Sequence, residues 1–459
     1  MRAGGQTKGM GTTYRPYQPD QPFLLPPSLR EWLPDGHLAY FISDTIDQMD
    51  LSALHERYEG DGRRGQPYHP TMLVKVLIYA YATGVFSSRK IARRVLEDVA
   101  LRVLAAGNQP DFRTVNRFRQ QNLQAFGVLF VQVVKLAKRM GLLKLGTVAL
   151  DGTKVKANAS KHKAMSYGRM QKAEQELEAE IQELVEKAQQ VDAAEDEIYG
   201  ADNSGDEIPA ELQRRETRLE KIREAKQALE AEQADKDRAK GRREGDGKVA
   251  GEVRPQGGRS KYKREFGVPK ATAQRNFTDP ESRIMKTQQG FEQCYNAQAV
   301  VEEGSQLVIA QQVGNNAADN PYLIEMLDQV KQNTGRKPQR ALADSGYKGE
   351  ENFEGLEKRK IQGVIALGRE NKQGGQAKAK GSGEATERMA KRLRSKRGQQ
   401  HYRRRKALVE PAFGWVKRVL GFREFSLRGL SKVQGEWSLV TLALNLRRMA
   451  RIESSVATA

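Results

Sequence analysis

Two aspartates each follow a short apolar run, a position at which many α/β proteins carry out their chemistry. Asp151 follows the run 147–150 and precedes Gly152, and Asp344 follows the run 340–343. Runs of this kind predict buried strands, whose carboxyl ends border the ligand-binding crevice of an open sheet. Carboxylates placed there can bind hard divalent cations, which prefer oxygen ligands. An Asp-Gly pair also occurs in ordinary turns, so Asp151 alone decides nothing.

A third acid is expected from a helix that packs across these strands, and the candidate is Glu410. Val409, Phe413 and Val416 give this basic segment an apolar inner stripe. Lys417 lies two helical turns beyond Glu410 on the same side, so it can reach a phosphate held near that acid. The alternative is that Glu410 only pairs with the surrounding cations. Its position after the last predicted strand favours the first interpretation.

The elements that would position these acids have the order of an RNase H-like fold. We expect strands at 147–150, 294–301, 306–313, 340–343 and 363–367, with helices at 320–330, 350–357 and around 402–417. In such a sheet the first strand lies beside the strand that follows the first helix, so Asp151 and Asp344 end on adjacent strands. The expected fold class is an α/β RNase H-like catalytic domain, with a mixed sheet and helices on both faces, over 143–160 and 276–459.

The composition indicates a polyanionic partner. The chain has 459 residues and a formal net charge of +20, which points to nucleic acid before an anionic membrane and argues against aspartyl or glycosidic acid chemistry. A single cysteine, Cys294, excludes a disulfide framework and favours a reducing, intracellular setting. Five scattered histidines show no zinc-ligand spacing, and we predict neither a signal peptide nor a membrane span.

The N-terminal third predicts a flexible arm and then a helical DNA-binding domain. Residues 1–30 are rich in Gly and Pro, whereas 31–142 have helical periodicity. Ser87 and Ser88 should cap one short basic helix. A later helix opens at Asp111 and presents outward the residues Arg113, Asn116, Arg117, Arg119 and Gln120. This pattern fits a helix-turn-helix whose later helix enters a major groove, and it fits equally well a helical bundle with a solvated basic face.

A heptad-like seam over 161–235 predicts an inserted antiparallel helical hairpin, broken near Pro209. Its charged flanks suit a solvated coiled coil, a dimer contact or a clamp on DNA. Two segments rich in Gly, Lys and Arg follow, and we expect a basic mobile loop at 236–275 and a basic loop within the catalytic domain at 368–400.

With these motifs together, the chain resembles the bacterial insertion-sequence transposases of the DDE type, in the group with the Tyr-Arg-Glu-Lys signature. The resemblance covers the N-terminal helices and the segments 149–154, 276–283, 290–300, 343–347 and 409–414. It implies that Asp151, Asp344 and Glu410 form a catalytic triad that holds two Mg²⁺ ions, with Mn²⁺ as a substitute.

The signature also implies DNA contacts by Tyr402, Arg405 and Lys417. Its usual spacing puts three residues between Arg and Glu, whereas four separate Arg405 from Glu410. Lys406 has the expected offset, so either cation can take the signature role. Lys154 is a further phosphate contact in this interpretation.

The resemblance implies a cytoplasmic, nucleoid-associated enzyme that binds insertion-element ends, cleaves DNA strands and joins the 3′ ends to target DNA. Its partners would be double-stranded DNA, as terminal inverted repeats and as target, and a second copy of the chain in a homodimer on DNA. Two other functions stay open. An RNase H-like nuclease would cleave without strand transfer, and a non-enzymatic DNA-binding protein derived from an element would need no acids.

Overall fold

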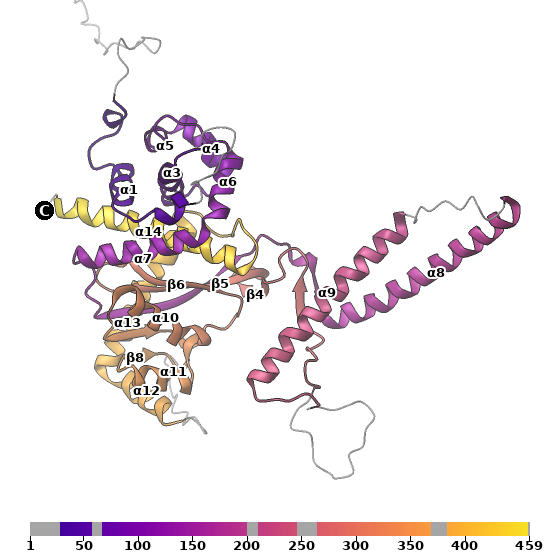
Figure 1. Ribbon diagram of the computed structural model, residues 1–459. Coiled ribbons are helices and arrows are strands. Elements are labelled where there is room, and N and C mark those ends of the chain that lie inside the picture. Colours follow the sequence, from indigo (N-terminus) through magenta and orange to yellow (C-terminus); the bar gives the residue numbers. More distant parts are fainter. Residues whose placement is uncertain (1–27, 57–66, 200–209, 246–263, 369–382, 458–459) are drawn as a thin grey trace, which may run out of the picture.

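The computed structural model describes residues 28–56, 67–199, 210–245, 264–368 and 383–457 (Figure 1). A central sheet is covered by helices on both sides, the N-terminal helices lie beyond one of these helical layers, and two long helices project sideways. Most of the arm predicted at 1–30 lies outside the described residues, which begin just before a short 3₁₀ helix at Leu29–Glu31. Within the described part of the chain, no helix is long and apolar enough to span a bilayer.

The sheet has six strands and the mixed order expected of an RNase H-like fold. Its order is β4 (Arg283–Thr287), β5 (Gly290–Glu302), β1 (Thr147–Lys156), β7 (Arg340–Ala343) and β8 (Gln362–Ile365), with β6 (Val308–Gly314) also paired to β5. β1 is antiparallel to β5 and parallel to β7, and β7 is parallel to β8. The prediction that the two aspartate-bearing strands are neighbours is therefore confirmed.

β1 runs further than its apolar residues predict. We expected the strand to stop at Leu150, but it continues through Asp151 as far as Lys156. The reason is its partner β5, which keeps pairing with it from Asp151↔Ala299 to Lys156↔Cys294. The parallel pairing to β7 covers only the first residues of β1, so Asp151 lies where the strand loses one of its two neighbours.

β4 was not predicted. β4 pairs with the first part of β5, and β6 pairs with the second part, so the long strand β5 pairs with two shorter strands. The polar residues of β4 and its turn, including the exposed Lys286, gave no apolar run to identify it. Such a composition is ordinary at a sheet edge, where charges discourage further pairing.

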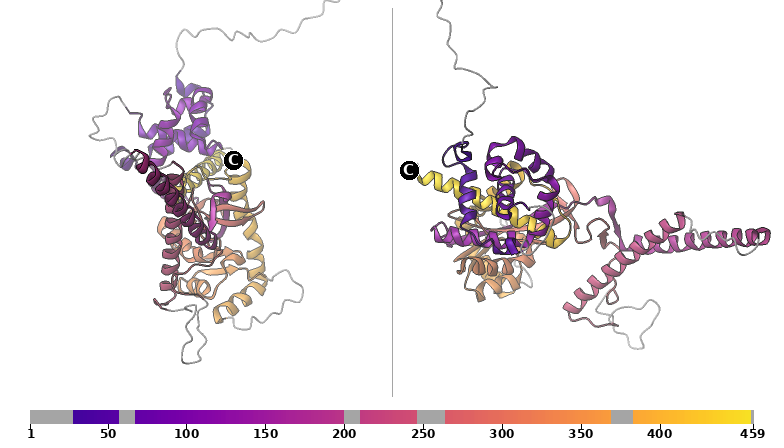
Figure 2. Two further views of the ribbon diagram at one scale, coloured as in Figure 1. Left: turned by 90° about the vertical axis from the view of Figure 1, so that its right-hand side faces the viewer. Right: turned by 45° about the horizontal axis from the view of Figure 1, so that its top comes forward.

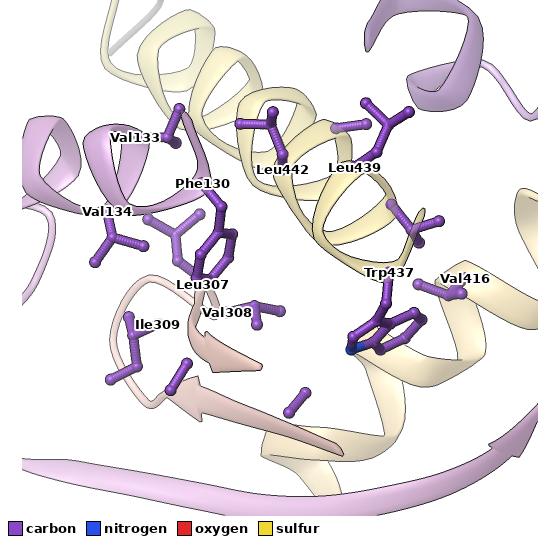
Figure 3. Close-up of a cluster of buried hydrophobic side chains, with 14 of the residues drawn as sticks. Phe130, Val133, Val134, Leu307, Val308, Ile309, Val416, Trp437, Leu439 and Leu442 are labelled. Atoms are coloured by element: carbon purple, nitrogen blue, oxygen red, sulfur yellow. The ribbon is translucent and has the colours of Figure 1, made fainter. Parts of the chain in front are cut away.

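Two groups of helices cover the sheet. Helix α13 (Lys396–Gly414) packs across β1, β5, β7 and β8, and α12 (Glu384–Arg394) and α11 (Glu350–Lys358) adjoin β8. Over β6 lie α7 (Leu123–Arg139), α10 (Leu323–Thr334) and α14 (Leu430–Ala457). Trp437 of α14 is almost fully buried here beside Val416, and Phe130 and Val134 of α7 lie in the same core beside Leu307 and Ile309 (Figure 3).

The N-terminal helices are α1 (Leu38–Asp47), α2 (Ser52–His55), α3 (Pro70–Ala82), α4 (Ser88–Glu97), α5 (Val99–Leu104) and α6 (Phe112–Gln121). Helical structure was predicted over 31–142, including the short helix capped near Ser87 and the later helix that opens at Asp111. Ser87 is the N-cap of α4, although its side chain makes no capping hydrogen bond. α3 and α7 both pack on α14, so the buried core of the N-terminal helices is continuous with that of the sheet. The domain boundary expected at residue 142 therefore does not divide the described residues into two separate hydrophobic cores.

Helices α8 (Tyr167–Tyr199) and α9 (Ala210–Ala239) pack on each other and project from the body (Figure 2). Their ion pairs run in opposite chain directions, from Arg215–Glu180 to Lys226–Glu174, as antiparallel helices require. A separate small core joins them, with buried residues Tyr167, Met170, Leu177, Leu219, Ile222, Ala225 and Leu229. The described part of the seam thus follows the predicted apolar positions. At the base, β2 (Ala164–Ser166) pairs with β3 (Gln274–Asn276).

The ranges predicted for the two basic loops include residues that the structure places in regular elements. α9 continues to Ala239, and residues 264–275 lie beside its end and run into β3, held by the Gly267 amide, which donates to the buried Asp237, and by Arg242, which donates to the Arg264 carbonyl. The part of the first loop at 246–263 lies outside the described residues. In the second, residues 384–394 form α12, whose buried residues are Ala385, Met389 and Leu393, and residues 396–400 begin α13; residues 369–382 are not described.

Candidate active site

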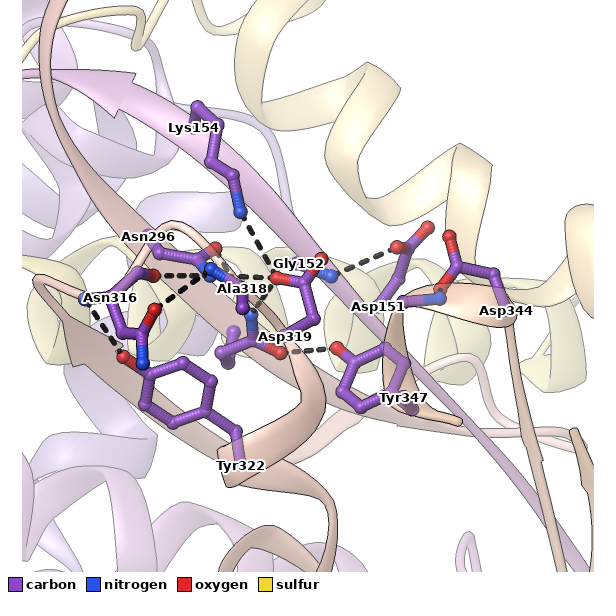
Figure 4. A network of polar contacts seen from close by, with 12 residues as sticks. Asp151, Gly152, Lys154, Asn296, Asn316, Ala318, Asp319, Tyr322, Asp344 and Tyr347 are labelled. Carbon is purple, nitrogen blue, oxygen red and sulfur yellow. Dashed lines mark hydrogen bonds and ion pairs between the residues drawn. The ribbon is translucent and has the colours of Figure 1, made fainter. Parts of the chain in front are cut away.

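The two aspartates predicted to act together lie side by side where the pairing of two neighbouring strands ends (Figure 4). Asp151 projects from β1, and Asp344 follows the last residue of β7, which pairs in parallel with β1. Ala149 of β1 pairs with Leu342 of β7, so each aspartate lies two residues beyond a paired residue. Each carboxylate is half-buried, so the pair is enclosed by protein and still reachable from outside.

Asp151 is held by a backbone amide and by a guanidinium. Its Oδ1 accepts a hydrogen bond from the Gly152 amide at 2.9 Å, and its Oδ2 lies 3.4 Å from Nη1 of Arg405. Burial raises the pKa of Asp151 to about 6, the charges of Asp344 and Asp319 add to that rise, and Arg405 opposes it. The site therefore concentrates negative charge that one arginine only partly offsets.

Asp344 caps the short turn that follows β7. Its Oδ1 accepts from the Gly346 amide at 2.8 Å, at the start of the 3₁₀ helix η5 (Ser345–Tyr347). Tyr347 is fully buried beneath the acids, and its hydroxyl donates to the side-chain carbonyl of Gln298. Burial, followed by the charges of Asp319, Asp151 and Asp344, raises the pKa of Tyr347 well above its usual value. Tyr347 therefore remains a neutral donor.

Glu410 lies on the predicted helix, but its side chain does not join the two aspartates. It is exposed on α13, and among the described residues no hydrogen bond or ion pair holds it and no three His, Cys, Asp or Glu side chains form a ready metal-binding group. The helix itself crosses the sheet as expected, with Val409 and Val416 buried. The sequence therefore predicted the helix and its inner face, while the structure leaves the third acid apart from the pair.

Arg405 and Lys417 reach β1 from either side of Glu410. Arg405 contacts Asp151, and Nζ of Lys417 donates to the carbonyl of Lys154 at 2.8 Å. Lys417 lies in a π-helical turn, η6 (Trp415–Val419), and such turns often occur at functional sites. Burial, followed by the charge of Lys154, lowers the pKa of Lys417.

The two candidates for the signature cation have different surroundings. Arg405 is only 8% exposed, and its Nε has no hydrogen-bond partner within the described residues. Lys406 is exposed on the other side of the helix, and Tyr402 is half-buried against the core. Arg405 is thus the cation that faces the acid pair.

Sequence reasoning missed one residue of the site, Asp319. Its Oδ1 accepts from Nζ of Lys154 at 3.1 Å, and so Lys154 has an internal partner in place of the expected phosphate. The same oxygen accepts from Asn296 and Gln298 of β5. Asp319 directly precedes the helical turn η4 (Asn320–Tyr322), where an acid is expected as an ordinary helix cap. A usable signal was the pair of polar residues on one face of the otherwise buried strand β5.

Only part of the predicted outer face of α6 is exposed. Arg113 and Arg117 face outward, and Arg113 lies 5.7 Å from the ring centroid of the exposed Phe112. The prediction that Arg119 faces outward is wrong. Arg119 is 3% exposed because its guanidinium donates to the Tyr81 hydroxyl, to a backbone carbonyl and to Oδ1 of Asn116. Asn116, a predicted base contact, therefore orients a buried arginine.

The donors around the pair suit a hard divalent cation. Asp151 and Asp344 supply carboxylate oxygens on adjacent strands, and burial followed by the charges of neighbouring acids raises the pKa of Asp151, an effect that a bound cation would oppose. No thiolate or imidazole lies among these donors. The pair thus fits Mg²⁺ or Mn²⁺ better than zinc.

Comparison with protein-family models gives two matches. Residues 27–121 match a family described as "Transposase domain (DUF772)", and residues 265–446 match one described as "Transposase DDE domain". Together they cover more than half of the chain. The second match includes Asp344 and Glu410 but begins after Asp151, which β1 brings to the same sheet. Neither a search of curated proteins nor a search of solved structures gave a match.

Proposed function

This chain belongs to the DDE transposases, enzymes of the polynucleotidyl transferase type, and from that premise we propose that it binds the terminal inverted repeats of an insertion element, cleaves the strands there and joins the 3′ ends to target DNA. DNA is the substrate that the family implies. The observation that carries the proposal is the pair of Asp151 and Asp344 on adjacent parallel strands, close enough for the charge of Asp344 to contribute to the raised pKa of Asp151.

Enzymes of this family generally use divalent metal ions. We propose that Asp151, Asp344 and Glu410 hold two Mg²⁺ ions, for which Mn²⁺ can substitute. When bound, such ions activate the attacking hydroxyl and offset the charge that builds up around phosphorus. Glu410 would contribute from α13, the helix whose Arg405 already contacts Asp151, and its exposure leaves it accessible to DNA and metal.

The chain's own cations would bind the phosphates near the acids. Arg405 lies 3.4 Å from Asp151, and its positive charge would attract the reacting phosphate to the acids. Lys417 lies against β1 three residues beyond Asp151 and would bind a neighbouring phosphate. Tyr402 and Lys406 extend this surface along α13. Lys154 contributes less than the sequence suggests, because Asp319 already pairs with it.

Sequence recognition would come from a different part of the chain. Helix α6 packs on α4 and presents Arg113 and Arg117, which would contact the duplex at the element end. The net charge of +20 supplies affinity that does not depend on sequence, through counterion release. We propose that two copies bind the paired ends as a homodimer.

The test is incubation of the purified chain with DNA fragments that carry the ends of its element, in Mg²⁺, with products resolved on a sequencing gel. The proposal predicts nicked or excised ends, followed by joined products in which a 3′ end of the element is linked to target DNA. Cleavage without joining would support the nuclease alternative. DNA binding without either reaction would support a non-enzymatic DNA-binding protein.

A further inference from the structure

We infer that Asp319 is a positioning residue of the active site, which fixes Asp151 and Asp344 relative to each other by bonding to β1 and β5 and by packing against the turns that follow the two acids. The inference rests on the proposed function, in which these two aspartates bind the divalent cations. It assigns to Asp319 no contact with metal or DNA.

The first observation is the set of donors on one oxygen. Oδ1 of Asp319 accepts from Asn296 at 2.7 Å, from Gln298 at 2.8 Å and from Lys154 at 3.1 Å (Figure 4). Lys154 lies on β1 three residues after Asp151, and the two amides lie on β5. One carboxylate oxygen therefore ties the loop before η4 to both central strands of the site.

The second observation is independent of these bonds and concerns two glycines. Gly152 directly follows Asp151, and a Cβ placed on it would lie 2.2 Å from Nε2 of Gln298 and 2.6 Å from Oδ1 of Asp319. The Gly346 amide donates to Asp344, and a Cβ placed on Gly346 would lie 2.9 Å from Oδ1 of Asp344 and 3.0 Å from Oδ2 of Asp319. Both glycines thus leave room for the same carboxylate, which lies between the two acid-bearing turns. A side chain at either glycine would push this carboxylate away.

Gln298 connects this arrangement to the core below it. Its amide donates to Asp319, its side-chain carbonyl accepts from the buried Tyr347, and its backbone carbonyl accepts from the indole of Trp437 at 3.1 Å. Gln298 thereby connects Asp319, which lies between the two acid-bearing turns, to buried side chains of the core. Supporting residues of this kind typically change metal affinity or activity by about 10- to 100-fold when they are removed.

The experiment measures Mn²⁺ binding to the full chain by electron paramagnetic resonance, without DNA, at a temperature where each variant is folded by circular dichroism. Asp319→Ala should weaken Mn²⁺ affinity by about 10- to 100-fold, and Asp319→Asn should recover most of it, because one acceptor oxygen remains for the strand donors. The matched control is Asp328→Ala, which breaks a 2.6 Å ion pair with Arg359 on α10 and α11 and should change the affinity less than twofold.

Gly152→Ala provides a second variant that keeps every carboxylate and should weaken Mn²⁺ binding similarly, which preserves the test if Asp319→Ala does not fold. Wild-type affinity in a folded Asp319→Ala or Gly152→Ala protein overturns the inference, as does an equal loss in the Asp328→Ala control. If Mn²⁺ binding is insensitive to Asp151→Asn and Asp344→Asn, the proposed metal site itself fails. If those variants abolish binding while Asp319→Ala retains it, only the positioning role fails.

Discussion

Two carboxylate groups of this chain have opposite surroundings. Glu436 of α14 is fully buried and accepts from the Tyr81 hydroxyl, from the Ser426 hydroxyl and amide and from the Leu427 amide. Asp151 is half-buried and has one amide and one distant guanidinium, with Asp344 beside it. A structural carboxylate is saturated with donors, whereas a carboxylate that must bind a ligand keeps unused oxygen lone pairs.

The contrast has an energetic consequence. A fully bonded buried acid holds its neighbours together, and removing it leaves those donors without partners. An under-bonded acid near another negative charge lowers stability and makes the site attractive to cations. Functional sites commonly carry such a cost, which the rest of the fold must offset.

The largest effect should come from removing either charge of the pair. Asp151→Asn or Asp344→Asn should lower cleavage of element-end DNA by at least about 10³-fold, because each removes a carboxylate that would bind and position the reactive centre. DNA binding should persist, since the phosphate contacts come from cations elsewhere. Cleavage on a sequencing gel and binding by anisotropy measure the two properties separately. Substantial Mg²⁺-dependent cleavage by Asp344→Asn would refute the assignment of the pair.

For Glu436, whose oxygens are fully hydrogen-bonded, we expect a loss of stability without a loss of activity. Glu436→Ala should lower the free energy of unfolding by about 3–5 kcal/mol, because it leaves the buried Tyr81 and Ser426 donors without their acceptor and removes a negative charge that acts on the buried Arg119. Denaturant unfolding measures this loss. Cleavage per folded molecule should stay near the wild-type level when assayed below the unfolding transition. A folded Glu436→Ala protein without activity would show that this network also serves catalysis.

The pH dependence of stability gives a smaller effect of opposite sign. Because burial and neighbouring acids raise the pKa of Asp151 to about 6 in the fold, its protonated form is favoured there relative to the unfolded chain, where its ordinary pKa is 3.8. Stability contributed by that form is complete below pH 3.8 and is lost as the pH rises through 6. Asp151→Asn should therefore gain on the order of 2 kcal/mol relative to wild type between pH 4 and 7.

Unfolding curves of both proteins in a chelator over that pH range provide the measurement. Asp328→Asn serves as a control with the opposite sign, because bonding to Arg359 lowers the pKa of Asp328. A difference between wild type and Asp151→Asn that is constant with pH would contradict the description of Asp151 as an under-bonded acid.

The same contrast explains what the sequence revealed. The inner face of α13 follows from local apolar periodicity, and the adjacency of Asp151 and Asp344 follows from the element order of an RNase H-like fold; both were predicted, whereas the edge strand β4 was not. Asp319, Glu436 and Arg119 could not be assigned, because their roles depend on partners far away in the chain. Arg119, for example, has the helical position of a surface residue until Tyr81 and α14 close over it. Local periodicity gives the face of a helix but cannot identify what covers its edge.

The smallest expected effect concerns the arginines of α6, which also divide into a buried, hydrogen-bonded residue and exposed ones. Arg119 is buried and bonded to Tyr81, to the Phe86 carbonyl and to Asn116, whereas Arg113 and Arg117 are exposed and available to phosphates. Arg113→Ala/Arg117→Ala should weaken binding to element-end DNA by roughly tenfold at moderate salt and reduce the slope of log affinity against log salt by about 2, one for each lost phosphate contact.

Fluorescence anisotropy over a range of KCl concentrations measures both quantities. The control is Lys358→Ala, an exposed cation on α11 that pairs within its own helix and lies away from α6. Since Arg113 and Arg117 support no buried group, the thermal unfolding of the double variant should match wild type, unlike that of a variant at Arg119. Unchanged affinity and salt slope would exclude α6 as the DNA contact, and the outward basic face of this helix would then be only a solvated surface.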